Sequence, residues 1–250
     1  MPRQLPAVLT LILIAALWIH GPIAQFADYH QFADQGSVLG MPHAADVLSN
    51  GGFALVAVWG LWKLQPLFCG KGWQPGRYGY GLFLAGLLLT TAGSGYYHLA
   101  PDNARLVWDR LPVALTCAGL LAATRAKYHP HPSRESELRD TLLLAFGAIA
   151  GVLWWRITDL RGAGDLRWYL LFQILPMVLI PLWQAMADAP RARRLAIAAA
   201  IVLYGAAKLA ELYDHQLQNL LHVISGHTLK HLLAAIAAAV LLPASERRTT

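Results

Sequence analysis

The sequence predicts an all-α, polytopic membrane helical bundle with a seven-helix core and one extra N-terminal helix. Of the 250 residues, 56% are hydrophobic and only 14% are charged, whereas soluble domains carry about 25% charged residues. The charges also occur in short clusters, and the stretches between them are apolar around every face of a helix. Such stretches suit helices that lie in lipid or inside a bundle. This composition excludes a soluble enzyme, a disordered chain and a disulfide scaffold.

Eight apolar stretches, separated by Gly, Pro and charge clusters such as residues 161–165, make up the predicted helices. A spanning helix needs roughly 20 residues, so eight of them leave room for short loops and no second domain. Trp and Tyr gather near several ends, as at Trp154 and Trp155, which is typical of helices that end at a membrane interface. The predicted spans are 5–21, 46–64, 78–100, 108–125, 140–157, 168–186, 194–212 and 221–242.

The predicted organisation has three parts. We expect residues 1–25 to form an N-terminal hydrophobic helix, residues 26–45 a non-cytoplasmic loop, and residues 46–250 the seven-helix core with a short cytoplasmic tail. The first span is also compatible with the apolar region of a signal peptide. Residues 22–24, where cleavage would occur, lack the small-x-small pattern, which favours a retained helix.

The basic residues are unequally divided between the two predicted membrane faces. Thirteen Lys and Arg lie on the face that holds both termini and six lie on the other, so the positive-inside tendency predicts cytoplasmic termini. The net charge is +6, but the basic residues form no continuous basic face, so we expect no nucleic-acid partner. The thirteen are Arg3, Lys63, Lys71, Arg77, Arg125, Lys127, Arg134, Arg139, Arg191, Arg193, Arg194, Arg247 and Arg248; the six are Arg105, Arg110, Arg156, Arg161, Arg167 and Lys208.

Histidines and acids are concentrated at the opposite, non-cytoplasmic face. His227 and His231 are four residues apart in the last span, so they share one helix face at a spacing that suits two ligands of one metal. His98 ends the third span, Ser94 lies one turn deeper, and Asp109 begins the next span. Each signal has a structural alternative: packed helix histidines, a serine bonded to its own backbone, and a helix N-cap.

The predicted topology brings His98, Asp109, His227 and His231 to a similar depth. Three imidazoles around one zinc with an open fourth position form a hydrolytic type of site, and ionisable groups within spans are functional candidates by default. Asp109 would then handle a water proton, and Ser94 would hydrogen-bond an oxyanion. By contrast, Lys208 and Glu211 are expected to form an i, i+3 ion pair and not to act in catalysis.

In these residues the sequence resembles the alkaline ceramidase family of the CREST superfamily, which comprises seven-helix zinc-dependent membrane hydrolases, and in particular its bacterial members. The resemblance is carried by Ser94-x3-His98, Asp109 and His227-x3-His231, and extends from about residue 45 to 242. It implies a zinc-dependent amidase that cleaves ceramide, or a related N-acyl lipid, to a sphingoid base and a fatty acid. It also implies a bacterial inner (plasma) membrane, with the active site toward the non-cytoplasmic face.

The resemblance leaves other points open. Eukaryotic members bind calcium through an acidic N-terminal segment; here Asp28, Asp34 and Asp46 precede Ser49, but the segment contains no Glu, so calcium stays a secondary expectation. An esterase or lipase on another membrane lipid would use the same zinc chemistry. A receptor-like membrane protein with a structural zinc is a further alternative, and an electron-transfer protein with haem held by histidines is a more distant one. The sequence does not specify the oligomeric state.

Overall fold

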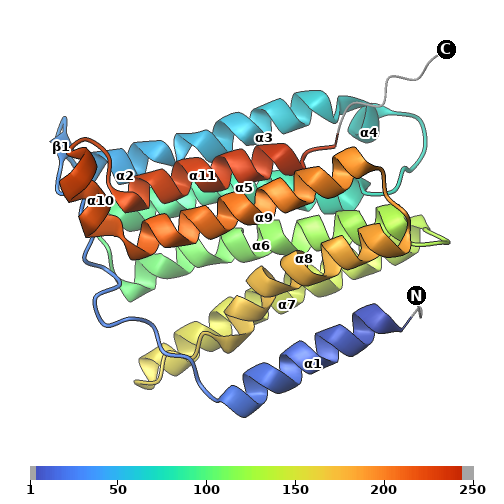
Figure 1. The fold of residues 1–250 in the computed structure, drawn as a ribbon, viewed down its shortest axis with the longest axis horizontal. Coiled ribbons are helices and arrows are strands. Elements are labelled where there is room, and N and C mark those ends of the chain that lie inside the picture. The colour runs from blue at the N-terminus through green and yellow to red at the C-terminus, as the bar shows by residue number, and fades with distance from the viewer. Residues whose placement is uncertain (1–3, 244–250) are drawn as a thin grey trace.

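The computed structural model describes residues 4–243 and shows an all-α bundle whose long helices lie side by side (Figure 1). The predicted tail from residue 244 onward, and Arg3, Arg247 and Arg248 in the charge comparison, lie outside the described residues. The elements are α1 (Leu5–His20), β1 (Ser37–Val38), β2 (Met41–Pro42), α2 (Ala44–Ser49), α3 (Gly51–Lys63), α4 (Gln65–Cys69), α5 (Arg77–Leu99), α6 (Asn103–Tyr128), α7 (Arg134–Leu160), α8 (Arg167–Met186), α9 (Arg191–Leu212), α10 (Asp214–Leu221) and α11 (Gly226–Leu241).

All eight predicted stretches fall on helices, which confirms the all-α prediction. Within the described part of the chain, five helical segments are long and apolar enough to cross a membrane: α2 with α3, α6, α7, α8 and α9. The pair α10 and α11, bent by 100°, would make a sixth if it is one broken span. Large apolar side chains such as Leu55, Phe146 and Val202 are exposed on the outside of the bundle. These are the features of an integral membrane protein.

Helix ends differ from the predicted ones where polar caps act. α6 and α7 begin several residues before their apolar stretches, because Asp102 accepts a hydrogen bond from the Arg105 amide (2.7 Å) and Ser133 caps α7 in the same way. The prediction of one continuous helix over 221–242 is wrong. His222 has a left-handed backbone (φ 62°), and α11 begins only after its own N-cap, Ser225.

α5 and α6 form the closest helix pair through a row of glycines. Gly79, Gly86 and Gly93 follow one another at intervals of seven residues on α5. A Cβ atom added to them would come within 2.1 Å of the Ala123 nitrogen, 2.3 Å of the Thr116 hydroxyl and 1.9 Å of the Trp108 oxygen, respectively. Small residues that let helix backbones touch are a common basis of helix packing in membranes. This contact places the end of α5 directly against the beginning of α6.

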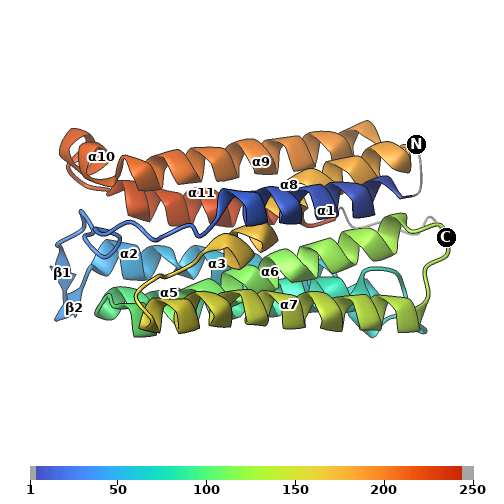
Figure 2. The same cartoon turned by 90° about the horizontal axis from the view of Figure 1, so that it is seen from below.

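α1 is peripheral to this bundle. It has no buried residue and packs mainly on α8, to which Leu13, Ile14 and Leu17 contribute partly buried contacts (Figure 2). The start of α1 and the short helix α4 lie at one end of the bundle, whereas α10 and the β1–β2 hairpin lie at the other (Figure 1). The extra N-terminal helix thus stands beside a core of seven helical rods, formed by α2 with α3, α5, α6, α7, α8, α9 and α11.

Candidate metal centre

Three histidines meet at the end of the bundle where α10 and the β1–β2 hairpin lie. His98 comes from the last turn of α5, and His227 and His231 from the first turns of α11. All three side chains are buried, and each offers a ring nitrogen within 4.8 Å of those of the other two. In the described part of the chain, this is the one group of three metal-ligating residues, and it could hold a metal ion.

The hydrogen bonding of the rings fits a metal ligand set. His98 is fully buried, yet neither of its ring nitrogens has a hydrogen-bond partner among the described residues. Buried polar atoms without partners cost about 1–3 kcal/mol each, and native structures contain few of them. A bound cation would satisfy one of these nitrogens, so the donor set fits the predicted type of site.

Ser49 fixes the tautomer of His231. The Ser49 hydroxyl donates its only proton to the carbonyl oxygen of Asp46 (3.0 Å) and lies 2.8 Å from Nδ1 of His231. Nδ1 must therefore carry a proton and donate it to Ser49 Oγ, which leaves the lone pair of Nε2 free for a ligand. Metal-binding histidines are commonly oriented through their other ring nitrogen in this way.

Buried carboxylates hold the N-terminal end of α11 in place. Asp46 Oδ1 accepts hydrogen bonds from the hydroxyls of Ser225 (3.0 Å) and Thr228 (2.6 Å), while Asp46 Oδ2 has no partner among the described residues. Asp214 accepts from the backbone amide of His227 through Oδ1 (2.7 Å) and from Ala33 through Oδ2 (2.8 Å). These acids connect α2, the N-terminal loop and α11 around the histidines.

The acidic residues that suggested a calcium site do not form a second group of potential metal ligands among the described residues. Asp34 accepts hydrogen bonds from the backbone amides of Gly36, Ala45 and Asp46, so its carboxylate caps the start of α2. Asp28 does not join Asp34 and Asp46 in a group of three potential ligands among residues 4–243.

Ser94 lies one helical turn from His98 on α5. It is buried, and its hydroxyl has no hydrogen-bond partner among the described residues, so the alternative of a serine bonded to its own backbone does not apply. Gly93, next to Ser94, touches the carbonyl oxygen of Trp108, the neighbour of Asp109. The backbones that carry Ser94 and Asp109 are therefore adjacent.

Asp109 is half-buried and lies inside α6, in its second turn. The alternative that Asp109 caps the helix is wrong, because α6 begins at Asn103 and Asp102 is its N-cap. No hydrogen bond joins the Asp109 side chain to the histidines in the described structure, so its catalytic role remains a prediction.

Aromatic rings enclose the histidine cluster. Phe32, from the loop after α1, packs with its ring centroid 4.6 Å from that of His98 and 4.5 Å from that of His227. The Phe53 ring lies 6.4 Å from His231 and also lines a partly open pocket of about 170 Å³. This mostly apolar pocket reaches Thr90, one turn beyond Ser94, and its lining also includes the polar residues Gln173 and Tyr204.

A chain of charged side chains borders His227. The predicted ion pair of Lys208 with Glu211 is confirmed (2.8 Å), and Lys230 of α11 contacts the same carboxylate (2.5 Å). Lys230 Nζ also lies 3.3 Å from Nε2 of His227. The two lysines and one glutamate therefore tie α9 to α11 beside the histidines.

Other histidines of this face do not join the cluster. His30 bridges the hydroxyl of Tyr97 and the side-chain oxygen of Asn103 (both 2.8 Å), and His43 contacts the backbone oxygen of Asp34. The sequence interpretation did not identify Ser49 or Phe32 as parts of the site. Ser49 could have been suspected as a polar residue near the beginning of an apolar span, whereas nothing in the sequence marks Phe32.

Comparison of the chain with protein-family models, with curated proteins and with solved structures finds no match.

Proposed function

We propose that the protein is a zinc-dependent, ceramidase-like hydrolase that cleaves the amide of a membrane lipid. The observation that carries the proposal is the buried set of His98, His227 and His231, with the hydroxyl of Ser94, which has no partner among residues 4–243, one turn from His98. A site that only stabilised the fold would have no need of a buried, unpartnered hydroxyl beside the ligands.

Zinc is the metal that this donor set favours, because three imidazoles and an open fourth position are typical of catalytic zinc sites. When bound there, zinc would polarise the substrate carbonyl and lower the pKa of a bound water to about 7. Ser49 keeps His231 in the tautomer that can bind it.

The chain's own residues would then carry the reaction. Ser94 donates a hydrogen bond from its hydroxyl to the carbonyl oxygen of the amide as negative charge develops there. Asp109 accepts a proton from the attacking water and returns it to the departing amine nitrogen as the carbon–nitrogen bond breaks. Phe32 covers the histidines and limits the access of bulk water.

A lipid substrate is supported by the surroundings of the cluster. The partly open pocket of about 170 Å³ is lined mainly by apolar residues from α3, α5, α6, α8, α9 and α11, which suits part of an acyl chain. A ceramide-like lipid would place its amide at the histidines and its chain in this pocket, releasing a sphingoid base and a fatty acid. The unequal distribution of Lys and Arg supports cytoplasmic termini and an active site toward the non-cytoplasmic face of a bacterial inner membrane.

Turnover in detergent tests this proposal. We expect purified protein to release fatty acid from ceramide faster than from a phospholipid ester offered alongside it. Asp109→Asn is expected to reduce turnover by about 10²–10⁴-fold and Ser94→Ala by about 10²–10³-fold, both with unchanged zinc content.

The matched control is Thr91→Ala, which removes a hydroxyl of α5 that bonds only to Leu87 of its own helix, and which we expect to retain activity. Unchanged turnover in Asp109→Asn would contradict the role of Asp109, and zinc without any turnover in the wild type would point to a structural metal. Preferential release from the ester would identify a lipase and contradict the amide substrate.

A further inference from the structure

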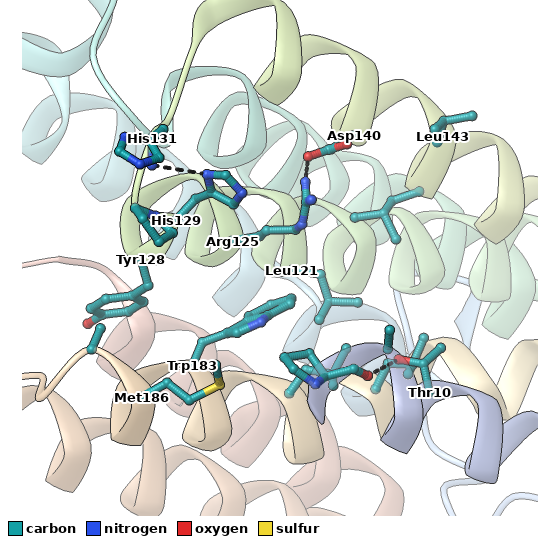
Figure 3. Close-up of a pocket in the computed structure, with 17 residues that line it drawn as sticks. Thr10, Leu121, Arg125, Tyr128, His129, His131, Asp140, Leu143, Trp183 and Met186 are labelled. Atoms are coloured by element: carbon teal, nitrogen blue, oxygen red, sulfur yellow. Dashed lines mark hydrogen bonds and ion pairs between the residues drawn. The ribbon is translucent and has the colours of Figure 1, made fainter. Parts of the chain in front are cut away.

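A large pocket lies at the end of the bundle where α1 begins, far from His98, His227 and His231. It has a volume of about 860 Å³ and is bordered by α1, α6, α7 and α8 (Figure 3). The pocket exists because α1 packs mainly on α8 and leaves the space toward α6 and α7 open. Its volume falls within the range of small-molecule sites, about 300–1,000 Å³.

One part of the pocket wall is apolar. Leu121 of α6, Leu144 of α7, and Leu175 and Leu179 of α8 line it. Ala7 of α1 forms part of the opposite side and is itself exposed. Because these helices lie within the membrane, the wall offers a surface on which an acyl chain can lie.

The other part of the pocket is polar and carries positive charge. Figure 3 shows Arg125, His129 and His131 gathered on one side, with Trp183 and Met186 of α8 across from them. Asp140 is the one acid among the residues that line the pocket, and both Arg125 and Arg139 contact it. Two guanidinium groups on one carboxylate leave a net charge of +1 here, before either histidine is protonated.

We propose that this pocket binds an acidic membrane phospholipid. Its phosphate would lie against Arg125 and the histidines at the membrane surface, and an acyl chain would follow the leucines between α1 and α7. Basic pockets between helices are known to hold acidic lipid head groups. The charge complements an anionic head group, and the polar and apolar parts follow one another as they do in a phospholipid. This inference is independent of the proposed hydrolase function.

Binding of lipid to purified full-length protein tests the inference. The probes are dioleoyl phosphatidylglycerol, which is acidic, and dioleoyl phosphatidylcholine, which has no net charge. Native mass spectrometry and thermal shift are the readouts. We expect the acidic lipid to bind more tightly and to raise the melting temperature more. Arg125→Gln leaves only the neutral pair of Arg139 with Asp140 and should weaken binding of the acidic lipid about fivefold, the effect of one charge near a membrane surface.

A second variant tests the apolar part without risk to the core. Ala7→Trp fills the pocket from its exposed side and should abolish binding of the acidic lipid. Leu11→Trp, on an exposed position of α1 outside the pocket, and Arg191→Gln, a basic residue near the same end of the bundle, are the matched controls and should bind as the wild type does.

Equal binding of the two lipids, or unchanged binding in both Arg125→Gln and Ala7→Trp, would overturn the inference. If Ala7→Trp instead converts a dimer to a monomer whichever lipid is present, a second copy of the chain occupies the pocket, and the lipid proposal is wrong.

Discussion

Single side chains at the metal centre act mainly by fixing the orientation of others. The Ser49 hydroxyl donates to the Asp46 carbonyl and contacts Nδ1 of His231, which selects one tautomer of that ring. The hydroxyls of Ser225 and Thr228 donate hydrogen bonds to the Asp46 carboxylate, and these bonds fix the position of the N-terminal end of α11. The His-x3-His spacing could be predicted from the sequence, but these supporting contacts join residues about 180 positions apart and follow no local pattern.

Loss of the Ser49 hydroxyl should therefore loosen the metal and not the fold. We expect Ser49→Ala to weaken zinc affinity by about 10–100-fold, the usual effect of removing a group that orients a histidine ligand. Competition with a chromogenic chelator measures this affinity, and Ser49→Thr should restore most of it because the hydroxyl returns. Equal affinities in wild type and Ser49→Ala would show that His231 does not depend on this bond.

Asp165 links the loop before α8 to three parts of the chain and predicts a pH dependence. Burial alone would raise the pKa of this carboxyl, but hydrogen bonds from Arg167, Trp154 and the Ile23 amide outweigh burial and lower the pKa from 3.8 to about 2. The carboxylate therefore stabilises the folded state fully above pH 4, and this contribution is lost as the pH falls from about 4 to 2. It amounts to about 2 kcal/mol.

The comparison of Asp165→Asn with wild type checks this stabilisation. We expect the variant to have a lower melting temperature in detergent at pH 6, and the difference between the two proteins to shrink at pH 2.5. A difference that stays constant between these pH values would contradict the role of the ionised carboxyl.

At the scale of helices, apolar stretches of the sequence predict where the helices lie, and polar residues determine where each helix begins or is interrupted. The starts of α6 and α7 lie outside the apolar stretches because Asp102 and Ser133 satisfy free backbone amides. The sequence did not predict the break between α10 and α11, because residues 222–225 form a short segment beside apolar residues. That break matters for the site, because it lets α11 begin just before His227.

Gly79, Gly86 and Gly93 of α5 should be intolerant of even one added methyl group. Gly79→Ala would place a Cβ 2.5 Å from the Ala123 Cα, so the backbones of α5 and α6 must separate. We expect a destabilisation of about 1–3 kcal/mol, measured as a lower melting temperature in detergent. Gly81→Ala, two residues on, meets only a Phe68 ring atom at 3.9 Å and should be neutral or stabilising, because Ala favours helix more than Gly does. Equal effects of the two changes would contradict the close packing.

At the scale of the whole molecule, the two ends of the bundle have different chemistry. One end gathers three histidines, buried acids and an enclosing aromatic residue, and the other has a large pocket lined by basic and apolar residues. Composition and hydropathy were sufficient to predict the all-α membrane bundle. The meeting of His98 with His227 and His231 was predicted from topology, because alternating spans bring their ends to the same face. The enclosing Phe32 could not be predicted, since loop positions depend on contacts made only after the bundle has formed.

The zinc content of purified protein tests the central claim most directly. We predict about one zinc per chain by metal analysis, and its loss in His98→Ala, His227→Ala and His231→Ala. His222→Asn, which changes an exposed histidine at the same end of the bundle, should keep the metal. Absence of zinc from the wild type after metal reconstitution, or full retention of zinc in His231→Ala, would contradict the account.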